Sequence, residues 1–367
     1  MNILVINPIL FTPEKSDIPC VYTIKDTMIY GFCMGFTQLG HKVTLLCAEE
    51  YKPQQNEVYE FEILFFKSNF KKIMSPAFLP FSWTCFKFLR ESERKYDFVI
   101  SSEVFSWYTF FSIISCSRRT IIWQELNCHQ HKFHKLPSLF WYNVICRFFY
   151  RNVMSIVPRS RSSASFIAGY SNKTSSVIID HGINLDKFDM SILKRRQFIS
   201  SSQLIYRKNV AGIIINFSNF LKISGFQDFI LYIVGRGPEE ENLKKIVEKL
   251  NLYANVKFLG FLSQKELNLY IKESMAFLVN TRQDLNMVSI PEAIVSGTPI
   301  LTNTIPASAE YIQENELGIV RNVWDENDMK NIVERNSFFV NNCISYRNNL
   351  SNIHCSQMFI DEYKHKE

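Results

Sequence analysis

The stretch Phe229–Leu250, FILYIVGRGPEEENLKKIVEKL, contains the parts of a strand–turn–helix unit. Its first six residues are apolar, which is typical of a buried strand. Gly235-Arg236-Gly237-Pro238 then forms a turn, and Glu239–Leu250 has a helical pattern. Three Glu residues open that helix, where the helix dipole favours negative charge. A strand that leads into a helix through a glycine turn is part of a βαβ unit, so this stretch predicts a parallel sheet.

The same alternation continues on both sides of this stretch. A helix is expected at Lys208–Leu221, with Val210, Ile213, Ile214, Phe217 and Leu221 facing inward. Strands are expected at Phe198–Leu204, Val256–Leu259, Ala276–Val279 and Pro299–Leu301. These segments predict one parallel sheet in the second half of the chain, followed by a helix at Ser351–Lys364.

The first half repeats the pattern. The helix expected at Thr27–Leu39, with Gly40 as its C-cap, separates two strand-like runs and completes a βαβ unit. The strands expected in this half are Ile3–Leu10, Lys42–Ala48, Phe98–Ser101, Thr120–Trp123, Val153–Val157 and Ser176–Ile179. We therefore predict an α/β fold of two Rossmann-like, doubly wound parallel-sheet domains that face a cleft at the carboxyl ends of their strands.

The predicted domains are residues 1–190, residues 191–345 and a C-terminal helical segment, 346–367. For that last segment, packing back on the N-terminal domain is one option. A length of 367 residues is enough for two separate cores. The formal net charge of +6 suits an anionic small ligand or an anionic membrane surface better than a nucleic acid.

Nine Cys without a CxxC pair indicate reduced thiols. The N-terminus does not resemble a signal peptide, and no run of 18 apolar residues occurs, so a cytoplasmic protein is expected.

Four segments resemble, in order and spacing, the retaining glycosyltransferases of the GT-B fold, specifically the group 1 family (family 4). They are SSQLIYRKN (201–209), LYIVGRGPEEENL (231–243), VKFLGFLSQKEL (256–267) and TRQDLNMVSIPEAIVSGTPILT (281–302). HGINLDKF (181–188) resembles the junction between the two domains of that family. The resemblance covers nearly the whole chain and is strongest over residues 198–312.

This resemblance implies roles for two carboxylates. The Glu-x7-Glu signature of the family is Asp284-x7-Glu292 here. Glu292 is implied to accept hydrogen bonds from both ribose hydroxyls of a nucleotide, and Asp284, one methylene shorter than Glu, to face the donor sugar. A helix is expected to begin near Val288, so the amides of Asn286, Met287 and Val288 are candidates to bind a diphosphate.

The same resemblance implies basic groups for the diphosphate. Lys208 matches the Lys of the family, but Gln203 stands five residues earlier, where the family has Arg. Arg207 is the candidate substitute for that charge. Gly235 and Gly237 are implied to border the nucleotide, whose base is not indicated by side chains. With basic groups at the diphosphate, no metal or other cofactor is expected.

In the first half, Glu125 follows a predicted strand, where the family often shows His. Two interpretations stand side by side: Glu125 orients or deprotonates the acceptor hydroxyl, or it is a polar loop residue. Cys128–His134 has loose metal-ligand spacing, and a basic loop on the acceptor side is the better interpretation. His181 is expected to be structural. Pro8–Pro19 lacks the glycines of the family loop, which favours a role in shaping the acceptor site.

Phe70–Lys95 mixes basic and aromatic residues. Such a stretch contacts an anionic membrane, or its aromatic residues belong to the core and its Lys residues to the rim.

The sequence therefore predicts a hexosyltransferase that moves sugar from a UDP-, GDP- or similar nucleotide sugar to a saccharide or polyprenyl-linked saccharide. The expected setting is O-antigen, capsule or lipopolysaccharide assembly, with peripheral membrane contact and no nucleic acid partner. A nucleotide-sugar 2-epimerase and a catalytically silent GT-B scaffold remain alternatives. Gln203, Asp284 and the glycine-free first loop keep the scaffold alternative open.

Overall fold

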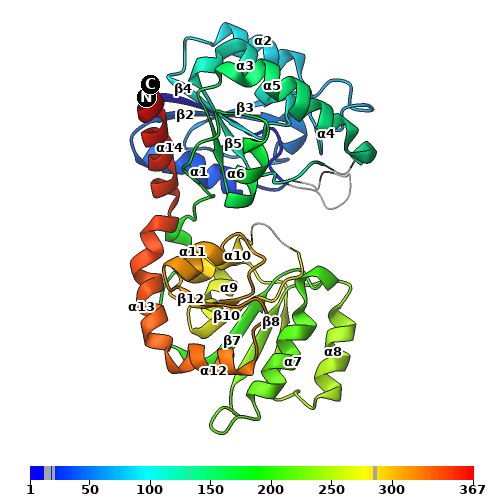
Figure 1. Ribbon diagram of the computed structural model, residues 1–367, viewed down its shortest axis with the longest axis vertical. Coiled ribbons are helices and arrows are strands. Elements are labelled where there is room, and N and C mark those ends of the chain that lie inside the picture. Colours follow the sequence, from blue (N-terminus) through cyan, green and yellow to red (C-terminus); the bar gives the residue numbers. More distant parts are fainter. Residues whose placement is uncertain (12–17, 19–20, 131, 284–286) are drawn as a thin grey trace. The chain divides into compact units, whose positions relative to one another are not determined.

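The computed structural model describes residues 1–11, 18, 21–130, 132–283 and 287–367. The chain forms two compact units (Figure 1). Unit 1 comprises Met1–Gly182 and Asn352–Glu367, and unit 2 comprises Ile183–Ser351. The predicted domain boundaries, after residues 190 and 345, lie a few residues from the boundaries between these units, which follow Gly182 and Ser351.

Unit 1 is built on a parallel sheet of six strands in the order β3-β2-β1-β4-β5-β6. The strand bounds are Asn2–Ile6 (β1), Lys42–Ala48 (β2), Glu62–Phe66 (β3), Phe98–Ser102 (β4), Thr120–Gln124 (β5) and Ser155–Pro158 (β6). Ile3, Leu4, Val5 and Ile6 of β1 are all buried, although they alternate between the two faces of the sheet. Because helices cover both faces, the central strands are continuous apolar runs.

The helices of unit 1 include short 3-10 and π turns as well as α-helices. The α-helices are Met28–Gln38 (α1), Trp83–Glu91 (α2), Trp107–Cys116 (α3), Leu136–Phe140 (α4), Arg147–Phe149 (α5), Arg161–Ala168 (α6) and Asn352–Lys366 (α14). The 3-10 segments are Glu49–Tyr51 (η1), Ser117–Arg119 (η2), Lys132–Lys135 (η3) and Tyr150–Asn152 (η5), and Trp141–Cys146 (η4) is a π-helix. The side chain of Thr27 caps α1, and Gly40 ends it with a positive φ of 81°.

Helix α14 lies against α1 (Figure 1), although more than 300 residues separate them in the sequence. The two backbones approach closely at two glycines of α1. A Cβ atom on Gly35 would lie 2.4 Å from the Asn352 carbonyl oxygen, and one on Gly31 would lie 2.6 Å from Asn352 Nδ2. The ring of Phe359 packs against Phe32, with centroids 5.2 Å apart. The core of unit 1 is therefore completed by residues that follow unit 2 in the chain.

Unit 2 has a second parallel sheet of six strands, in the order β12-β11-β10-β7-β8-β9. Numbered from the first strand of each unit, both sheets follow the order 3-2-1-4-5-6 of Rossmann-like folds. The strand bounds are Arg195–Ser201 (β7), Ile230–Val234 (β8), Val256–Gly260 (β9), Ser274–Leu278 (β10), Ile300–Thr302 (β11) and Gly318–Val320 (β12). The predicted α/β class with two doubly wound parallel sheets is confirmed.

The α-helices of unit 2 are Val210–Phe220 (α7), Glu240–Lys249 (α8), Gln264–Ile271 (α9), Ser289–Val295 (α10), Ala309–Glu314 (α11), Glu326–Glu334 (α12) and Asn336–Tyr346 (α13). Three short turns, Leu185–Lys187 (η6), Tyr206–Lys208 (η7) and Arg347–Leu350 (η8), complete the unit. Of the side chains expected to face inward from α7, Val210, Ile213, Ile214 and Phe217 are buried and Leu221 is half-buried.

Three strand predictions need correction. Apolar runs did not reveal β3, which pairs with β2 at the sheet edge, or β12, which has three residues. The strand expected at Ser176–Ile179 was wrong. Scattered backbone hydrogen bonds, such as Ile179 N–H to the Pro158 carbonyl (3.0 Å), hold that segment beside β6 without forming a ladder.

Candidate functional site

The basic residues predicted to bind a diphosphate lie in unit 2, after the carboxyl end of β7. Tyr206–Lys208 form the 3-10 turn η7, and α7 begins only at Val210. Between them, Asn209 adopts a left-handed conformation with φ 49°, which Asn tolerates better than most residues. Arg207 and Lys208 therefore stand on a turn before the helix, which corrects the helix start expected at Lys208. Arg207 is exposed and Lys208 is half-buried.

The segment after β10 is bonded to this turn. The Arg207 carbonyl accepts hydrogen bonds from the Thr281 hydroxyl (3.0 Å) and from the Arg282 N–H (2.7 Å). In return, the Arg207 guanidinium donates to the Gln283 carbonyl at 3.4 Å. The structure thus brings Arg207 to the residue that precedes Asp284 in the chain. Asp284 itself lies outside the described residues.

Glu292 occupies the first turn of α10, whose N-cap is Val288, as expected. Its side chain is buried, with the residue 8% exposed, and Gln264 Nε2 donates a hydrogen bond to Glu292 Oε1 at 2.7 Å. Of the residues predicted to offer amides to a diphosphate, Met287 is buried and Val288 is exposed. Asn286 lies outside the described residues.

Gly235 and Gly237 are required by the packing of two neighbouring loops. A Cβ atom on Gly235 would lie 1.9 Å from the Ser202 carbonyl oxygen, and one on Gly237 would lie 2.3 Å from the Leu204 carbonyl oxygen. The Leu204 N–H also donates to the Arg236 carbonyl at 2.9 Å. Protein packing therefore accounts for both glycines, and their role toward a nucleotide stays a prediction.

Sequence reasoning missed three side chains at this edge of unit 2. Arg282 lies over the Tyr206 ring at 4.2 Å and donates to the Tyr206 carbonyl at 2.6 Å. Buried Asn303 donates to the Thr281 carbonyl at 2.6 Å. Asn303 directly follows β11, so the rule that polar residues after parallel strands form sites would have found it. Gln264 begins α9, and no sequence signal marks it.

The corresponding edge of unit 1 is organised around a buried arginine. Arg159, directly after β6, pairs with Glu125, directly after β5, at 2.6 Å between Nη1 and Oε2. The Arg159 side chain is only 6% exposed, whereas 41% of the Glu125 side chain is exposed. The guanidinium also lies over the Trp123 ring at 4.8 Å. The structure therefore holds the Glu125 carboxylate in place while leaving part of it accessible.

Arg159 also contacts Asp180 and His181. Its Nη2 lies 3.4 Å from Asp180 Oδ1 and 2.7 Å from His181 Nδ1. Burial alone would raise the pKa of Asp180, but the contacts with His181 and Arg159 lower it to about 2. The His181 ring is buried, and its Nε2 has no hydrogen-bond partner within the described part of the chain. His181 was expected to be structural, and it takes part in this polar network as well.

Glu103 is a second carboxylate of this network that the sequence did not indicate. It follows β4 with a positive φ of 68°, a strained conformation for Glu. Its carboxylate accepts hydrogen bonds from the backbone amides of Glu125 (2.8 Å) and Leu126 (3.4 Å). Burial and the Glu125 charge nevertheless raise the pKa of Glu103 to about 8. Residues that follow β4, β5 and β6 therefore converge in one network.

Gln124, which precedes Glu125, is a structural residue. It is fully buried, and its Oε1 accepts a hydrogen bond from the Val104 amide at 2.9 Å. Its Nε2 donates to the Leu126 carbonyl (2.9 Å) and to the Tyr142 hydroxyl (3.0 Å). Gln124 thus fixes the loop that carries Glu125.

The Cys128–His134 stretch does not form a metal centre in the described residues. Both ring nitrogens of His129 are engaged, Nδ1 with the Ser138 hydroxyl (3.1 Å) and Nε2 with the Tyr170 hydroxyl (2.9 Å). Burial lowers the pKa of His129, and Lys135 acts in the same direction. Across the described ranges of the chain, no group of three His, Cys, Asp or Glu side chains is placed to hold a metal.

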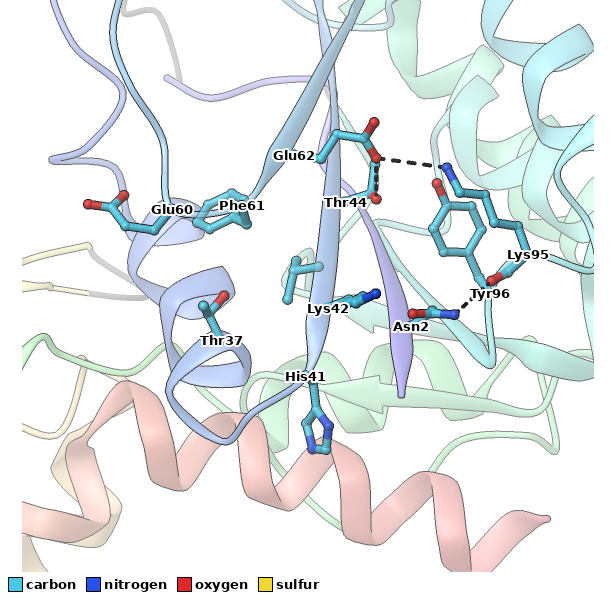
Figure 2. A pocket seen from close by; sticks show the side chains of 11 residues that line it. Asn2, Thr37, His41, Lys42, Thr44, Glu60, Phe61, Glu62, Lys95 and Tyr96 are labelled. Carbon is cyan, nitrogen blue, oxygen red and sulfur yellow. Dashed lines mark hydrogen bonds and ion pairs between the residues drawn. The ribbon is translucent and has the colours of Figure 1, made fainter.

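A hollow of about 460 Å³ lies at the opposite edge of the unit 1 sheet (Figure 2). Its lining includes Asn2, Lys42 and Glu62, which begin β1, β2 and β3. Glu62 accepts a hydrogen bond from Thr44 (2.8 Å) and pairs with Lys95 (3.9 Å). Rossmann-like sheets bind ligands at the carboxyl ends of their strands, so this hollow is not the candidate site.

The two Rossmann-like sheets match solved structures of the GT-B fold. The apo form of lipopolysaccharide outer core galactosyltransferase WaaB matches this chain with a TM-score of 0.68, at 13% identity and with 100% of both chains covered. Anabaena Alr3699/HepE in complex with UDP matches with a TM-score of 0.67, again at 13% identity over 100% of both chains. At such low identity these structures establish the fold.

The sequence also matches a family model and curated proteins over part of its length. Residues 184–353 match the family model "Glycosyl transferases group 1", the family that the sequence resemblance indicated. Alpha-monoglucosyldiacylglycerol synthase of Streptococcus pneumoniae (strain ATCC BAA-255 / R6) is 24% identical over 210 residues, which are 53% of this chain and 46% of that protein. The chain spans about half the length, or less, of the curated relatives it matches.

Proposed function

We propose that the protein is a retaining glycosyltransferase that transfers a sugar from a nucleoside diphosphate sugar to a hydroxyl of a saccharide or lipid-linked saccharide. One observation carries this proposal. Within a group 1 domain, the Arg207 turn and the buried carboxylate of Glu292 both follow carboxyl ends of strands in the same Rossmann-like sheet. A nucleotide needs cations for its diphosphate and an acceptor for its ribose hydroxyls, and this edge offers both.

The reaction follows from these groups. The bond between the anomeric carbon and the diphosphate oxygen breaks, and the acceptor oxygen forms a bond on the same face of that carbon. The acceptor proton passes to the leaving diphosphate, so neither a protein nucleophile nor a metal is proposed. The donor-binding groups are the side chains of Lys208 and Arg207 and the amides of Asn286, Met287 and Val288 for the diphosphate, Asp284 for the sugar, and Glu292 for the ribose.

Unit 1 supplies the acceptor-binding residues in this proposal. The half-exposed carboxylate of Glu125 orients the acceptor hydroxyl, and Arg159 holds that carboxylate through its ion pair of 2.6 Å. The preference for this role over a plain loop residue rests on the buried Arg159, because a buried cation that fixes a partly exposed carboxylate is typical of a preorganised site.

The class of acceptor is proposed from the relatives. The names of the similar proteins refer to a glycolipid, alpha-monoglucosyldiacylglycerol, and to the lipopolysaccharide outer core. We therefore propose an acceptor from bacterial glycolipid or surface-polysaccharide assembly. None of the helices in the described residues is long and apolar enough to span a membrane.

Contact with an anionic membrane is proposed for unit 1, at a surface other than Phe70–Lys95. Three Lys residues of that stretch already pair with acids, Lys71 with Glu50, Lys87 with Glu91 and Lys95 with Glu62.

The run 126–179, in contrast, contains seven Lys and Arg and no acidic residue. Within it, α4 to η5 expose the apolar side chains of Leu136, Phe140, Phe148 and Phe149 beside Lys135, Arg147 and Arg151. Cationic and apolar groups together suit an anionic lipid surface.

Vesicle sedimentation tests this surface. The protein should bind phosphatidylcholine vesicles that contain phosphatidylglycerol more strongly than pure phosphatidylcholine vesicles. Substituting Ser for Phe148 and Phe149 should reduce binding, whereas substituting Ser for Ile73 and Trp83 should not. A loss confined to the second variant would return the contact to Phe70–Lys95, and no binding to either vesicle would reject membrane contact.

Thermal unfolding with nucleotides tests the transferase proposal. UDP, GDP and ADP should be compared, because the nucleotide base is unknown, and UDP is the first choice because it is bound in the Anabaena structure. A ligand at about 100 times its dissociation constant adds about 2.7 kcal/mol to the stability of the native state. One nucleotide should raise the melting temperature, and Glu292→Ala should abolish the rise. No rise with any nucleotide would favour a catalytically silent scaffold.

A further inference from the structure

Two side-chain contacts join α9 to α10. Gln264 Nε2 donates to Glu292 Oε1 at 2.7 Å, and Asn268 Nδ2 donates to the Ser296 hydroxyl at 2.7 Å. The second contact lies four residues further along both helices, one turn on, where side chains of one face recur. The two pairs are therefore successive contacts of one helix–helix interface, with Gln264 and Glu292 nearer to the start of both helices.

The contact between Asn268 and Ser296 belongs to a set of hydrogen bonds that fix α9. Asn268 is 3% exposed, and it also bonds the backbone of Asp189, accepting from its N–H at 3.0 Å and donating to its carbonyl at 3.1 Å. At the start of α9, Ser263 and Glu266 form a capping box. Helix α9 is thus fixed by its capping box and by the hydrogen bonds of Asn268. Gln264 is the first residue of this helix, so the fold determines its position beside Glu292.

The chemistry of this contact suits a carboxylate that must remain charged and open. A buried carboxylate needs hydrogen-bond donors. A carboxamide meets that need without neutralising the charge, as Lys or Arg would. A carboxylate has about four acceptor positions, and the Gln264 amide uses one. The bond restricts rotation of the carboxylate plane, so its acceptor positions point in defined directions.

We propose that Gln264 is a positioning residue for the ribose of the nucleotide. By fixing the Glu292 carboxylate, it allows Glu292 to accept hydrogen bonds from the 2′- and 3′-hydroxyls together, and it sets the preference of the site for ribonucleotides over 2′-deoxyribonucleotides. This inference rests on the proposed function, in which Glu292 meets the ribose.

The test is the ratio of the dissociation constants for UDP and 2′-deoxy-UDP, measured by titration calorimetry, with GDP and 2′-deoxy-GDP in parallel. A hydrogen bond to a charged group is worth about a factor of ten or more in affinity, so wild-type protein should prefer UDP by about that factor. Gln264→Leu should weaken UDP binding by roughly the same factor and 2′-deoxy-UDP binding much less. The ribose preference should therefore largely disappear.

Asn268→Ala is the matched control, because Asn268 contacts Ser296 and Asp189 instead of Glu292. It should lower the melting temperature yet keep the ribose preference of the wild-type protein. An unchanged preference in Gln264→Leu would overturn the inference, and so would tighter UDP binding, which would show that Gln264 competes with the ligand.

Failure of the proposed function would look different. In that case the wild-type protein would bind none of these nucleotides, or Glu292→Gln would keep the full ribose preference. Either result would remove Glu292 from the ribose and overturn the inference as well. A wild-type preference that Glu292→Gln abolishes and Gln264→Leu retains would overturn the inference alone.

Discussion

At the carboxyl edge of the unit 1 sheet, a buried arginine lies among three carboxylates, whereas in the described residues at the same edge of the unit 2 sheet the backbone carbonyl of an arginine joins two loops. Arg159 contacts Glu125 and Asp180 directly, and the Glu103 charge also acts on it. In unit 2, the Arg207 carbonyl is the acceptor for both Thr281 and Arg282. Two sheets with the same strand order thus build their edges from different kinds of interaction.

The difference matches what each edge is proposed to bind. A diphosphate brings its own negative charge, which the basic residues of unit 2 are proposed to meet. A neutral hydroxyl brings no charge, and a carboxylate that orients it must be held by the protein itself. Burial alone would lower the pKa of Arg159, but its carboxylate neighbours raise it above the ordinary value. The cation of unit 1 is therefore used internally.

Arg159→Met should have the largest effect on stability. It leaves the Glu125 and Asp180 carboxylates without their buried partner, and breaking such a pair costs about 3–5 kcal/mol. Urea denaturation measures the loss. Arg207→Met, at an exposed position of unit 2, should change stability by about 0.5 kcal/mol or less while weakening nucleotide binding.

A double variant separates lost charge balance from lost packing in unit 1. Adding Asp180→Asn to Arg159→Met removes one uncompensated charge and should recover part of the stability. If Arg159→Met were as stable as Arg207→Met, the contrast between a charged and a backbone-linked edge would be wrong.

Gly237→Ala should have the next largest effect, and it probes unit 2. The new Cβ atom would overlap the Leu204 carbonyl, a backbone atom that cannot rotate away. Forced overlap of this kind costs about 1–3 kcal/mol. Gly169→Ala is the control, because its Cβ would lie 3.4 Å from the Phe166 carbonyl oxygen, an ordinary contact distance. Equal melting temperatures for the two variants would contradict the close approach of the two loops.

Glu103→Gln should have the smallest effect, and the effect should depend on pH. The pKa of Glu103 is raised in the folded protein to about 8, so the folded state keeps a proton that the unfolded chain loses above about 4.5. The stability from this proton is complete at low pH and is lost as the pH rises through 8. Relative to wild type, Glu103→Gln should therefore become progressively more stable as the pH rises from 5 to 9.

Lys194 of unit 2 should make stability depend on pH in the opposite direction from Glu103 of unit 1. Burial lowers its pKa to about 7, and its Nζ donates to the Lys272 carbonyl at 2.7 Å. Between pH 7 and 10 the unfolded chain carries a proton that the folded protein lacks, so stability rises with pH in that window. The difference in melting temperature between wild type and Lys194→Met should follow this rise. Parallel slopes for Lys194→Met and Glu103→Gln would contradict these assignments.

Most of the fold could be predicted from periodicity. Buried parallel strands such as β1 and β8 are continuous apolar runs, and the helices between them have one apolar face. The failures lie at sheet edges. A strand of three residues such as β12 carries too few positions for a pattern, and Ser176–Ile179 is apolar because it packs beside β6 without pairing regularly.

The candidate site was less accessible to sequence reasoning. Glu125 and Arg207 stand where a strand end or a motif points to them, but Arg159 looks like any surface arginine in the printed sequence. Its burial arises because three strands end beside one another, which only the sheet order decides. Gln264 is similar, since its partner Glu292 is 28 residues away and nothing local connects them.

The position of α14 has a consequence for synthesis on the ribosome. Residues 352–366 are made after the whole of unit 2, yet Phe359 packs against Phe32 in the core of unit 1. Unit 2 has all of its residues in one continuous stretch and can fold as soon as that stretch has emerged. The nascent unit 1 instead keeps an open groove along Gly31 and Gly35 until the last helix arrives. Its apolar lining is the part of the growing chain that a chaperone would need to cover longest.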